Sequence, residues 1–271
     1  LGYKGLIDTQ RNLVCASMPP SGCAYTYDYT SNDLAISQTI YPQYGFEPYG
    51  VGSFGMSMAM SPDGAWLLVG SPLASEVPSN FVGTYNANAN YRSINIVRYQ
   101  GLLYQAKVDI TGTGTSTITD TSKWRQVYNN LAYLYGSGTG VVNQGMVDVY
   151  RFYNGQWLPV ETILSPNPVV GEMFGSEISI GVDGTNYYLA ISAPGSTNGT
   201  VYTYSFTGST WNLMSSEILG TAIGQGYGNG LAMSYTGSVL VISSPSTDTV
   251  DIYKKNLSNV YTLSQTISPV S

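Results

Sequence analysis

Apolar and polar residues alternate in short runs along this chain, and each run ends at a turn signal. In three places an aromatic residue followed by glycine opens such a run, and a turn dipeptide comes nine residues after the aromatic. The aromatic-glycine pairs are Phe54-Gly55, Phe174-Gly175 and Tyr227-Gly228, and the turns are Asp63-Gly64, Asp183-Gly184 and Thr236-Gly237. Period-two alternation that leads into such a turn is typical of a β-hairpin. The pattern therefore predicts a hairpin at each place.

A continuous apolar run follows each turn and stops at a small residue and proline. The N-terminal part of the chain has a run of the same form, so four second strands are predicted, at 13–19, 66–72, 188–194 and 240–245. Such runs are expected of strands buried on both faces, and the proline ends them. Third strands are predicted to run up to Tyr27, Tyr150, Tyr204 and Tyr253, and fourth strands to follow at 36–40, 160–164, 214–219 and 263–267. The regular spacing of the tyrosines predicts that they pack between the repeated units.

Four strands per unit, repeated along the chain, are the signature of the blades of a β-propeller. The sequence thus predicts an all-β fold of four-stranded antiparallel blades. Residues 1–12 are too short and irregular to supply a first strand and its turn, so one partial and three full blades are expected. Because a propeller closes with about four to eight blades, two alternatives remain open: a compact ring, or an arc whose other blades lie outside this sequence. The missing strand favours the arc, and the start at Leu1 indicates processing or a fragment.

The order of these marks resembles the FG-GAP repeat of integrin-α-type propellers. Residues 174–206 match best, and the resemblance covers most of the chain outside 73–144. Calcium-binding versions of that repeat carry an Asp-rich loop before Asp-Gly, but here Asp63 and Asp183 supply one carboxylate each. Calcium takes about six to eight oxygen ligands. The two residues are therefore predicted to be turn residues, and neither a metal site nor a cofactor is expected.

Residues 73–144 interrupt the second blade between its second and third strands. Blades are therefore expected at 1–72 and 145–271, with an insertion that projects from the face carrying the loops between blades. Within the insertion, residues 91–127 resemble the chitin-binding-type carbohydrate modules of chitinases and phage tail proteins. The shared elements are Val-x-Tyr-x-Gly-x-x-Tyr-x-Ala-Lys at 97–107, a Gly/Thr-rich loop and a closing Trp. The Gly-Asp before the first Val and the loop Pro of that family are absent here.

This second resemblance implies that Tyr99, Tyr104 and Trp124 are candidate carbohydrate contacts. Aromatic faces pack on the apolar face of a pyranose, and nearby polar groups take its hydroxyls. A module this small has little other core. At least two of the three side chains are therefore also expected to pack inward.

Composition narrows the chemistry that the chain supports. Charged residues are 10% of the 271 residues, the net charge is −6 and no basic stripe exists, so nucleic acid is not an expected partner. Histidine is absent, which removes the commonest general base and zinc ligand. The carboxylates are scattered, with no pair placed for glycosidase-type catalysis, so no catalytic residue is predicted. No apolar run approaches about 18 residues, so no membrane insertion is expected.

Two cysteines, Cys15 and Cys23, flank a Pro-Pro-Ser-Gly turn symmetrically. A disulfide across the hairpin is geometrically possible at such a place. Two half-buried thiols are the other interpretation, and the sequence leaves both open.

These features together predict a non-enzymatic protein. The leading hypothesis is a structural and adhesion component of a phage tail or tail fibre, located in the virion tail, that binds a host surface glycan. It is expected to form a homo-oligomer and to contact other tail proteins, because multivalency adds up weak sugar contacts. The alternative is a cellular or secreted adhesion or lectin-type FG-GAP propeller, at the cell surface or outside the cell, and an enzyme stands third.

Overall fold

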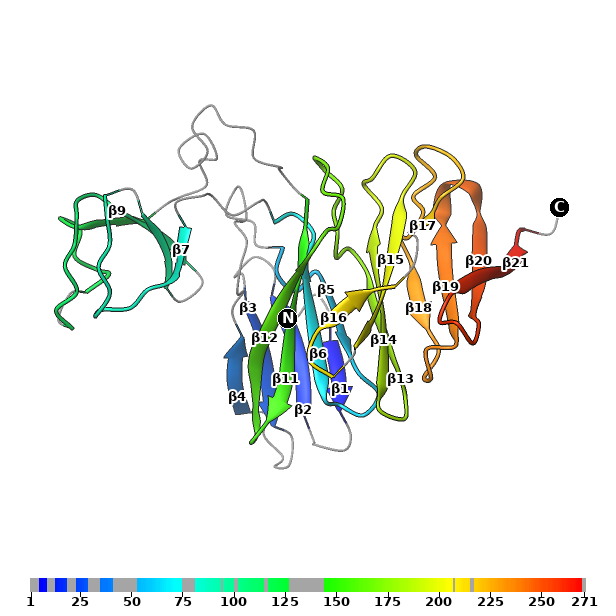
Figure 1. The fold of residues 1–271 in the computed structure, drawn as a ribbon, viewed down its shortest axis with the longest axis horizontal. Coiled ribbons are helices and arrows are strands. Elements are labelled where there is room, and N and C mark those ends of the chain that lie inside the picture. The colour runs from blue at the N-terminus through cyan, green and yellow to red at the C-terminus, as the bar shows by residue number, and fades with distance from the viewer. Residues whose placement is uncertain are drawn as a thin grey trace.

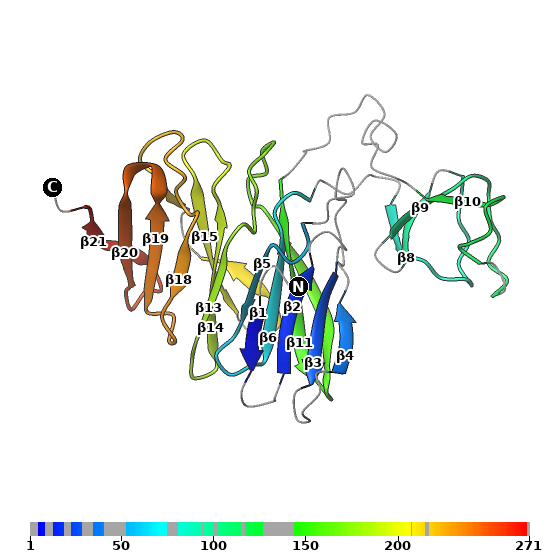
Figure 2. The same cartoon turned by 180° about the vertical axis from the view of Figure 1, so that it is seen from behind.

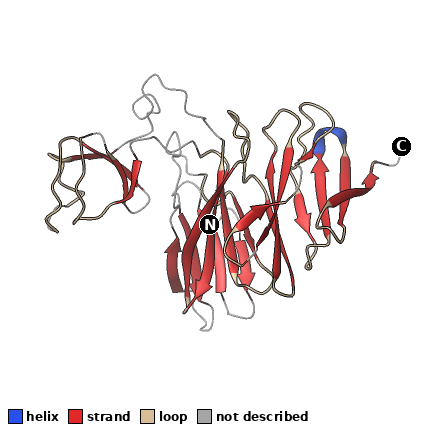
Figure 3. Ribbon diagram, viewed as in Figure 1, coloured by secondary structure: helices blue, strands red, loops and turns tan. Residues whose placement is uncertain are grey.

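The computed structural model describes residues 5–8, 13–18, 23–28, 35–40, 53–74, 81–93, 95–99, 102–114, 117–126, 144–206, 208–214 and 217–269. Within these ranges the fold is all-β, and the helical structure is one short 3-10 turn at Pro245–Thr247 (Figure 3). No helix among the described residues has the length and apolar character needed to cross a membrane.

Four antiparallel sheets make up most of the fold, and the strands of each follow one another along the chain except where the insertion separates β6 from β11 in the second sheet. The first sheet holds β1 (Gly5–Asp8), β2 (Leu13–Met18), β3 (Cys23–Asp28) and β4 (Ala35–Ile40). The second holds β5 (Ser57–Met60), β6 (Trp66–Ser71), β11 (Met146–Tyr153) and β12 (Gln156–Leu164). The third holds β13 (Ile178–Asp183), β14 (Asn186–Ala193), β15 (Thr200–Phe206) and a split fourth strand, β16 (Trp211–Leu213) and β17 (Ile218–Leu219). The fourth holds β18 (Leu231–Met233), β19 (Val239–Ser244), β20 (Thr249–Lys255) and β21 (Tyr261–Ile267).

The four sheets lie face to face in chain order, as Figures 1 and 2 show from opposite sides. Their first strands are neighbours in the same order: β1 contacts β5, β5 contacts β13, and β13 contacts β18. The fourth sheet has one face on the third sheet. Its other face is not covered by any part of the chain that the structure describes.

The first sheet is complete, so the prediction of a partial unit was wrong. β1 pairs with β2, with Gly5 opposite Ala16. The strand escaped prediction because it is four residues long and its hairpin lacks an Asp-Gly signal. Its register repeats that of the second sheet, where Met58 lies opposite Val69. The first strand therefore occupies its regular place in the repeat.

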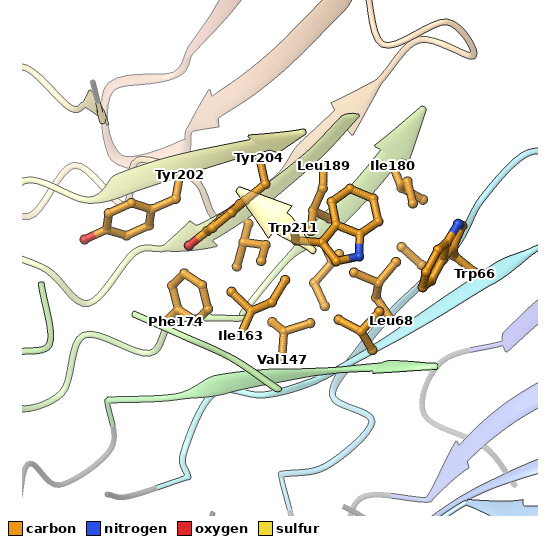
Figure 4. Close-up of a cluster of buried hydrophobic side chains, with 14 of the residues drawn as sticks. Trp66, Leu68, Val147, Ile163, Phe174, Ile180, Leu189, Tyr202, Tyr204 and Trp211 are labelled. Carbon is orange, nitrogen blue, oxygen red and sulfur yellow. The ribbon is translucent and has the colours of Figure 1, made fainter. Parts of the chain in front are cut away.

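One hydrophobic cluster fills each space between neighbouring sheets. The continuous apolar runs supply much of it, since all of β6 and the last six residues of β14 are buried. The aromatic residues of the aromatic-glycine pairs each belong to one cluster: Phe54 between the first and second sheets, Phe174 between the second and third, and Tyr227 between the third and fourth. Figure 4 shows the cluster between the second and third sheets. The predicted burial of these runs on both faces is confirmed for β6 and β14.

The recurrent third-strand tyrosines pack between sheets in three of the four repeats, as predicted. Tyr150 and Tyr204 are buried in two of the clusters, and Tyr253 packs against a third. Tyr27 is half-buried, and its ring centroid lies 6.3 Å from that of Tyr25.

Two glycines let adjacent sheets approach closely where the third strand begins. Gly145 has a φ of +82°, and a Cβ there would lie 2.0 Å from the carbonyl oxygen of Phe174. Gly199 has a φ of +76°, and its Cβ would lie 2.4 Å from the carbonyl oxygen of Tyr227. The amide of Phe174 also donates a hydrogen bond to the carbonyl of Gln144 at 2.8 Å. The repeated motif therefore marks the contacts between one sheet and the next.

The hairpin aspartates are turn residues, as predicted. Asp63 and Asp183 each precede a glycine of positive φ. The Asp63 carboxylate accepts hydrogen bonds from the Ser61 hydroxyl at 2.6 Å and from the Ala65 amide at 3.1 Å. It also accepts one from the hydroxyl of Tyr187 in the third sheet at 2.6 Å, so this turn helps to join two sheets. The described residues contain no group of three or more acidic or cysteine side chains placed to hold a metal ion.

The two cysteines are buried thiols on adjacent strands, without a disulfide between them. Cys15 lies opposite Thr26, and Cys23 lies opposite Met18. They are therefore offset along the hairpin instead of facing each other.

The insertion between β6 and β11 forms a small sheet of its own. Its strands are β7 (Phe81–Thr84), β8 (Ile96–Tyr99), β9 (Leu102–Ala106) and β10 (Trp124–Gln126), in the order β10-β9-β8-β7. The β7–β8 pair is parallel and the other two pairs are antiparallel. Residues 75–80 and 127–143, which connect this sheet to the second sheet, lie outside the described residues.

Candidate functional site

The three aromatic residues predicted from the insertion lie against one hydrophobic cluster. Trp124 is 2% exposed, and its ring packs edge-on against Tyr91 and Tyr85 with centroids 5.1 and 5.6 Å apart. Tyr99 and Tyr104 are half-buried and pack against the same cluster. Trp124 is thus a core residue of the insertion, and carbohydrate contact by Tyr99 and Tyr104 stays a prediction.

A buried carboxyl lies in the loop between β12 and β13. Glu172 is fully buried and accepts hydrogen bonds from the Ser165 hydroxyl and from the amide of Val169, the latter at 3.0 Å. Burial raises the pKa of this carboxyl, and the negative charge of Glu217 acts in the same direction. A buried carboxyl with a raised pKa is a candidate for catalysis. The equivalent loop of the next repeat shows which structural role the same position has.

In that repeat Gln225 holds the same position, two residues before the aromatic of the aromatic-glycine pair. Its side-chain carbonyl accepts a hydrogen bond from the amide of Ala222, three residues earlier, at 3.1 Å, as Glu172 does from Val169. The neutral side-chain amide of Gln225 therefore has the same role in its loop as the carboxyl of Glu172 has in the other. Glu172 is therefore a loop-closing residue.

Replacing Glu172 with Gln is expected to preserve the fold and to reduce the pH dependence of stability. A carboxyl whose pKa is raised holds its proton more tightly in the folded state. Its stabilising contribution is therefore full below its ordinary pKa of 4.5 and is lost as pH rises through the folded-state value. The free energy of unfolding in urea, measured from about pH 4 to about pH 8, should fall less with pH in Glu172→Gln than in the wild type.

Glu172→Ala is the matched control for this experiment. It leaves the Val169 amide and the Ser165 hydroxyl without their acceptor, so a loss of about 1–3 kcal/mol is expected at every pH. Equal pH slopes in the wild type and in Glu172→Gln would contradict the assignment of a raised pKa to this carboxyl.

Large aromatic side chains fill the space between the second and third sheets at the end where β6 begins. Tyr187, Phe206 and Trp211 of the third sheet surround Trp66 of the second, with ring centroids between 4.8 and 6.0 Å from that of Trp66. Trp66 and Trp211 are labelled in Figure 4. The guanidinium carbon of Arg151 lies 5.4 Å from the centre of the Trp66 ring. The space between two neighbouring sheets is called a junction below, and aromatic side chains fill this one.

The corresponding positions of the fourth sheet hold Ser238, Lys255 and Tyr261. The strand registers establish this equivalence, because Lys255 lies opposite Tyr261 as Phe206 lies opposite Trp211. The smaller and polar side chains do not fill the space between the third and fourth sheets. A cavity of about 390 Å³ opens there.

The cavity has a mixed aromatic and polar lining. It is lined by Thr185, Asn186, Tyr188, Ser205, Phe206, Gly208 and Asn259. The ammonium nitrogen of Lys255 lies 3.6 Å from the centre of the Tyr188 ring and donates a hydrogen bond to Oδ1 of Asn259 at 3.1 Å. A positioned positive charge therefore contacts two residues that line the cavity, Tyr188 and Asn259.

A second cavity of about 210 Å³ lies on the same junction. It is lined by Thr203, Glu217, Ile218, Leu219, Tyr253, Val260 and Tyr261. Val260 follows Asn259 of the first cavity, and the carboxylate of Glu217 accepts a hydrogen bond from the side-chain amide of Asn167. The two cavities are called the junction groove below. Sequence reasoning missed it, although Lys255 in place of a repeated Phe was a usable signal.

Comparisons with known proteins identify no family for this chain. No family model matches it, and no curated protein matches it. Solved structures give a general likeness only. A candidate 6-phosphogluconolactonase from Bacteroides fragilis has 12% identity and a TM-score of 0.44, over 97% of this chain and 69% of that one. The periplasmic gluconolactonase of Pseudomonas aeruginosa has 11% identity and a TM-score of 0.41, over 97% of this chain and 69% of that one.

The predicted function is corrected by these neighbours. They carry the names of lactonase enzymes, and a further one from Bacteroides uniformis does so at 14% identity and a TM-score of 0.43, over 97% of this chain and 70% of that one. The non-enzymatic phage tail or fibre protein, and the adhesion or lectin-type alternative, are therefore not retained. The prediction failed because abundant Tyr, Gly, Ser and Thr suit any sheet protein with many tight turns, so this composition does not identify a virion protein.

Proposed function

We propose that the four sheets are consecutive blades of a β-propeller built from FG-GAP-type repeats. Three features support this: the face-to-face order of the sheets, the adjacency of their first strands, and the repeated contact between a third-strand glycine and the next aromatic-glycine pair. The module-like insertion between β6 and β11 is then an addition to the second blade. The repeats provide a rigid frame that presents the spaces between blades as binding sites.

We further propose that the junction groove binds a small hydroxylated ring compound that carries an anionic group. The observation that carries this proposal is the ammonium group of Lys255, held by the Tyr188 ring and Asn259, which both line the larger cavity. Hydroxyl and amide groups of Thr185, Asn186 and Ser205 line the same cavity. An aromatic side chain suits the apolar face of a ring, and amides and hydroxyls suit its polar edge.

The size and charge of the groove favour a small ligand. The larger cavity, about 390 Å³, lies within the range of about 300–1,000 Å³ that is usual for small-molecule sites. Lys255 donates one hydrogen bond to Asn259, and an ammonium has three donors. Its other donors can serve a carboxylate or phosphate. A hydrogen bond to a charged group contributes about 1.5–3 kcal/mol, so the anionic group should raise affinity by about tenfold or more.

Isothermal titration calorimetry with glucuronate, glucose 6-phosphate, gluconolactone and glucose tests this proposal. The lactone is included because three of the structural neighbours carry lactonase names. Acid release from it in a pH-stat measures turnover directly. We expect the two anions to bind about tenfold more tightly than glucose, in line with a charged hydrogen bond. Lys255→Met should remove that difference.

Lys254→Met is the matched control, because Lys254 is the adjacent lysine on the same strand and is exposed. It should leave the affinities unchanged. Lys255→Phe, which introduces the residue that the third repeat has at this position, Phe206, should close the groove and abolish binding of all four compounds. Equal binding of anions and glucose, or equal losses in Lys254→Met and Lys255→Met, would refute the assigned role of Lys255.

A further inference from the structure

The uncovered face of the fourth sheet carries aliphatic side chains at positions that are buried in the other sheets. Val241 lies opposite Ile252 in the fourth sheet, as Leu68 lies opposite Val149 in the second. Leu68 and Val149 are fully buried against the third sheet. Val241 and Ile252 are only partly buried, because the described part of the chain places no further sheet on them.

Burial along β19 separates the two faces of this sheet. Leu240, Ile242 and Ser244 alternate with less buried residues and face the third sheet. The other face presents an aliphatic strip, made of Val239, Val241, Val250, Ile252 and Ile267. Ile267 is 47% exposed. β-branched residues in this pattern are typical of a sheet face that packs against another layer.

The three junctions within the chain indicate what covers such a face. At each of them, the face of one sheet that points toward the next repeat packs on the face of the following sheet that points back toward the previous repeat. The described contacts of the first sheet with the other repeats run to the second sheet, through β1 with β5 and β4 with β12. The described part of the chain therefore leaves one face of the fourth sheet uncovered, and no described repeat packs in front of the first sheet.

We infer that the aliphatic strip of one molecule packs on the first sheet of a second copy of this chain, and that the same contact is made in return. Two arcs of four sheets then close into one ring of eight, which is within the range of about four to eight sheets found in propellers. Two identical head-to-tail contacts related by a twofold axis close without leaving a free face. The inference rests on the proposed propeller arrangement, and it is independent of the ligand proposed for the junction groove.

The contact between copies has to differ from the internal junctions in one respect. Asp248 holds the position of Gly145 and Gly199 at the start of the third strand, with a φ of +50°. Its side chain keeps the incoming backbone further away at that point. The aliphatic strip therefore carries most of the contact energy, which makes single substitutions in it informative.

Sedimentation velocity of the 271-residue chain, from about 1 to about 100 µM, tests the inference. We expect a species of twice the 29.1 kDa mass of one chain. Val241→Asp and Ile252→Asp place a charge in the strip and should each give a monomer. Their far-UV circular dichroism should match the wild type, since these side chains are partly exposed in a single molecule. Val160→Asp is the control, because Val160 is 44% exposed on β12, away from the strip, and this variant should remain a dimer.

A wild-type monomer at the highest concentration would overturn the inference, and so would assemblies that grow beyond the dimer, because they would lack closure. Persistence of the dimer in both strip variants would place the contact elsewhere and would also overturn it. If a strip variant fails to fold, hydrogen exchange of the wild type decides: amides of β20 should gain protection with concentration, and constant protection would refute the contact. Binding of ligands to the junction groove is measured separately, so failure of either proposal leaves the other testable.

Discussion

Gly145→Ala is expected to lower the free energy of unfolding by about 2–5 kcal/mol, since left-handed strain of about 1–2 kcal/mol adds to overpacking of about 1–3 kcal/mol. The new Cβ would lie 2.0 Å from the carbonyl oxygen of Phe174 and 2.6 Å from its amide nitrogen, which are backbone atoms of the next sheet. The variant cannot relieve this overlap by turning a side chain. It has to separate the second and third sheets and lose the hydrogen bond from Phe174 to Gln144. Urea unfolding followed by tryptophan fluorescence measures the loss.

Comparison with Gly155→Ala separates the steric part of this effect from the strain of the left-handed backbone. Gly155 has almost the same backbone conformation, with a φ of +80° against +82° for Gly145, but a Cβ there meets no atom within 4 Å. Only the strain of the left-handed conformation remains, about 1–2 kcal/mol. If the two variants were equally destabilised, the close approach of the sheets at Gly145 would have no energetic importance.

The sheet architecture was predictable because its signals are local. An aromatic-glycine pair, a turn nine residues later and an apolar run ending at Pro are all read from short segments such as 174–194. These segments place the strands and also mark the contacts between sheets, because the glycine before the third strand touches the next aromatic-glycine pair. Where a signal was absent, as in the hairpin of β1 and β2, the strand was missed.

The junction groove was not predictable in the same way, because it arises from a difference between repeats. Lys255 stands two residues after Tyr253, as Phe206 stands two residues after Tyr204, so the substitution itself can be read from the spacing. That these positions lie between two sheets, and that a space is open beside Lys255, follows only from the strand pairing and the packing.

The insertion shows a different limit of sequence reasoning. Tyr99, Tyr104 and Trp124 were selected as carbohydrate candidates, and all three belong to or pack against one hydrophobic cluster. Sequence alone cannot tell which ring of such a small module faces inward, because the same residue type serves core and ligand. Packing on Tyr85 and Tyr91 places Trp124 in the core.

Trp66→Ala should cost about 3–5 kcal/mol, as expected for removal of a fully packed tryptophan. Trp66 is 2% exposed, and its ring contacts those of Tyr187, Phe206 and Trp211 across the junction. The three remaining rings all come from the third sheet and cannot collapse into the space without moving that sheet. Guanidinium chloride unfolding, followed by far-UV circular dichroism, measures the change.

Two further variants make the result specific to packing between the sheets. Trp66→Phe keeps an aromatic ring in the cluster and should recover about half of the loss, as a smaller cavity requires. Tyr153→Ala removes a side chain that is 60% exposed at the end of β11, and its effect should stay within about 0.5 kcal/mol. The aromatic cluster and the junction groove occupy the same place in successive repeats, so Trp66→Ala makes a closed junction resemble the open one. A loss no larger than that of Tyr153→Ala would mean that these rings do not hold the second and third sheets together, and the difference between the two junctions would then not explain the groove.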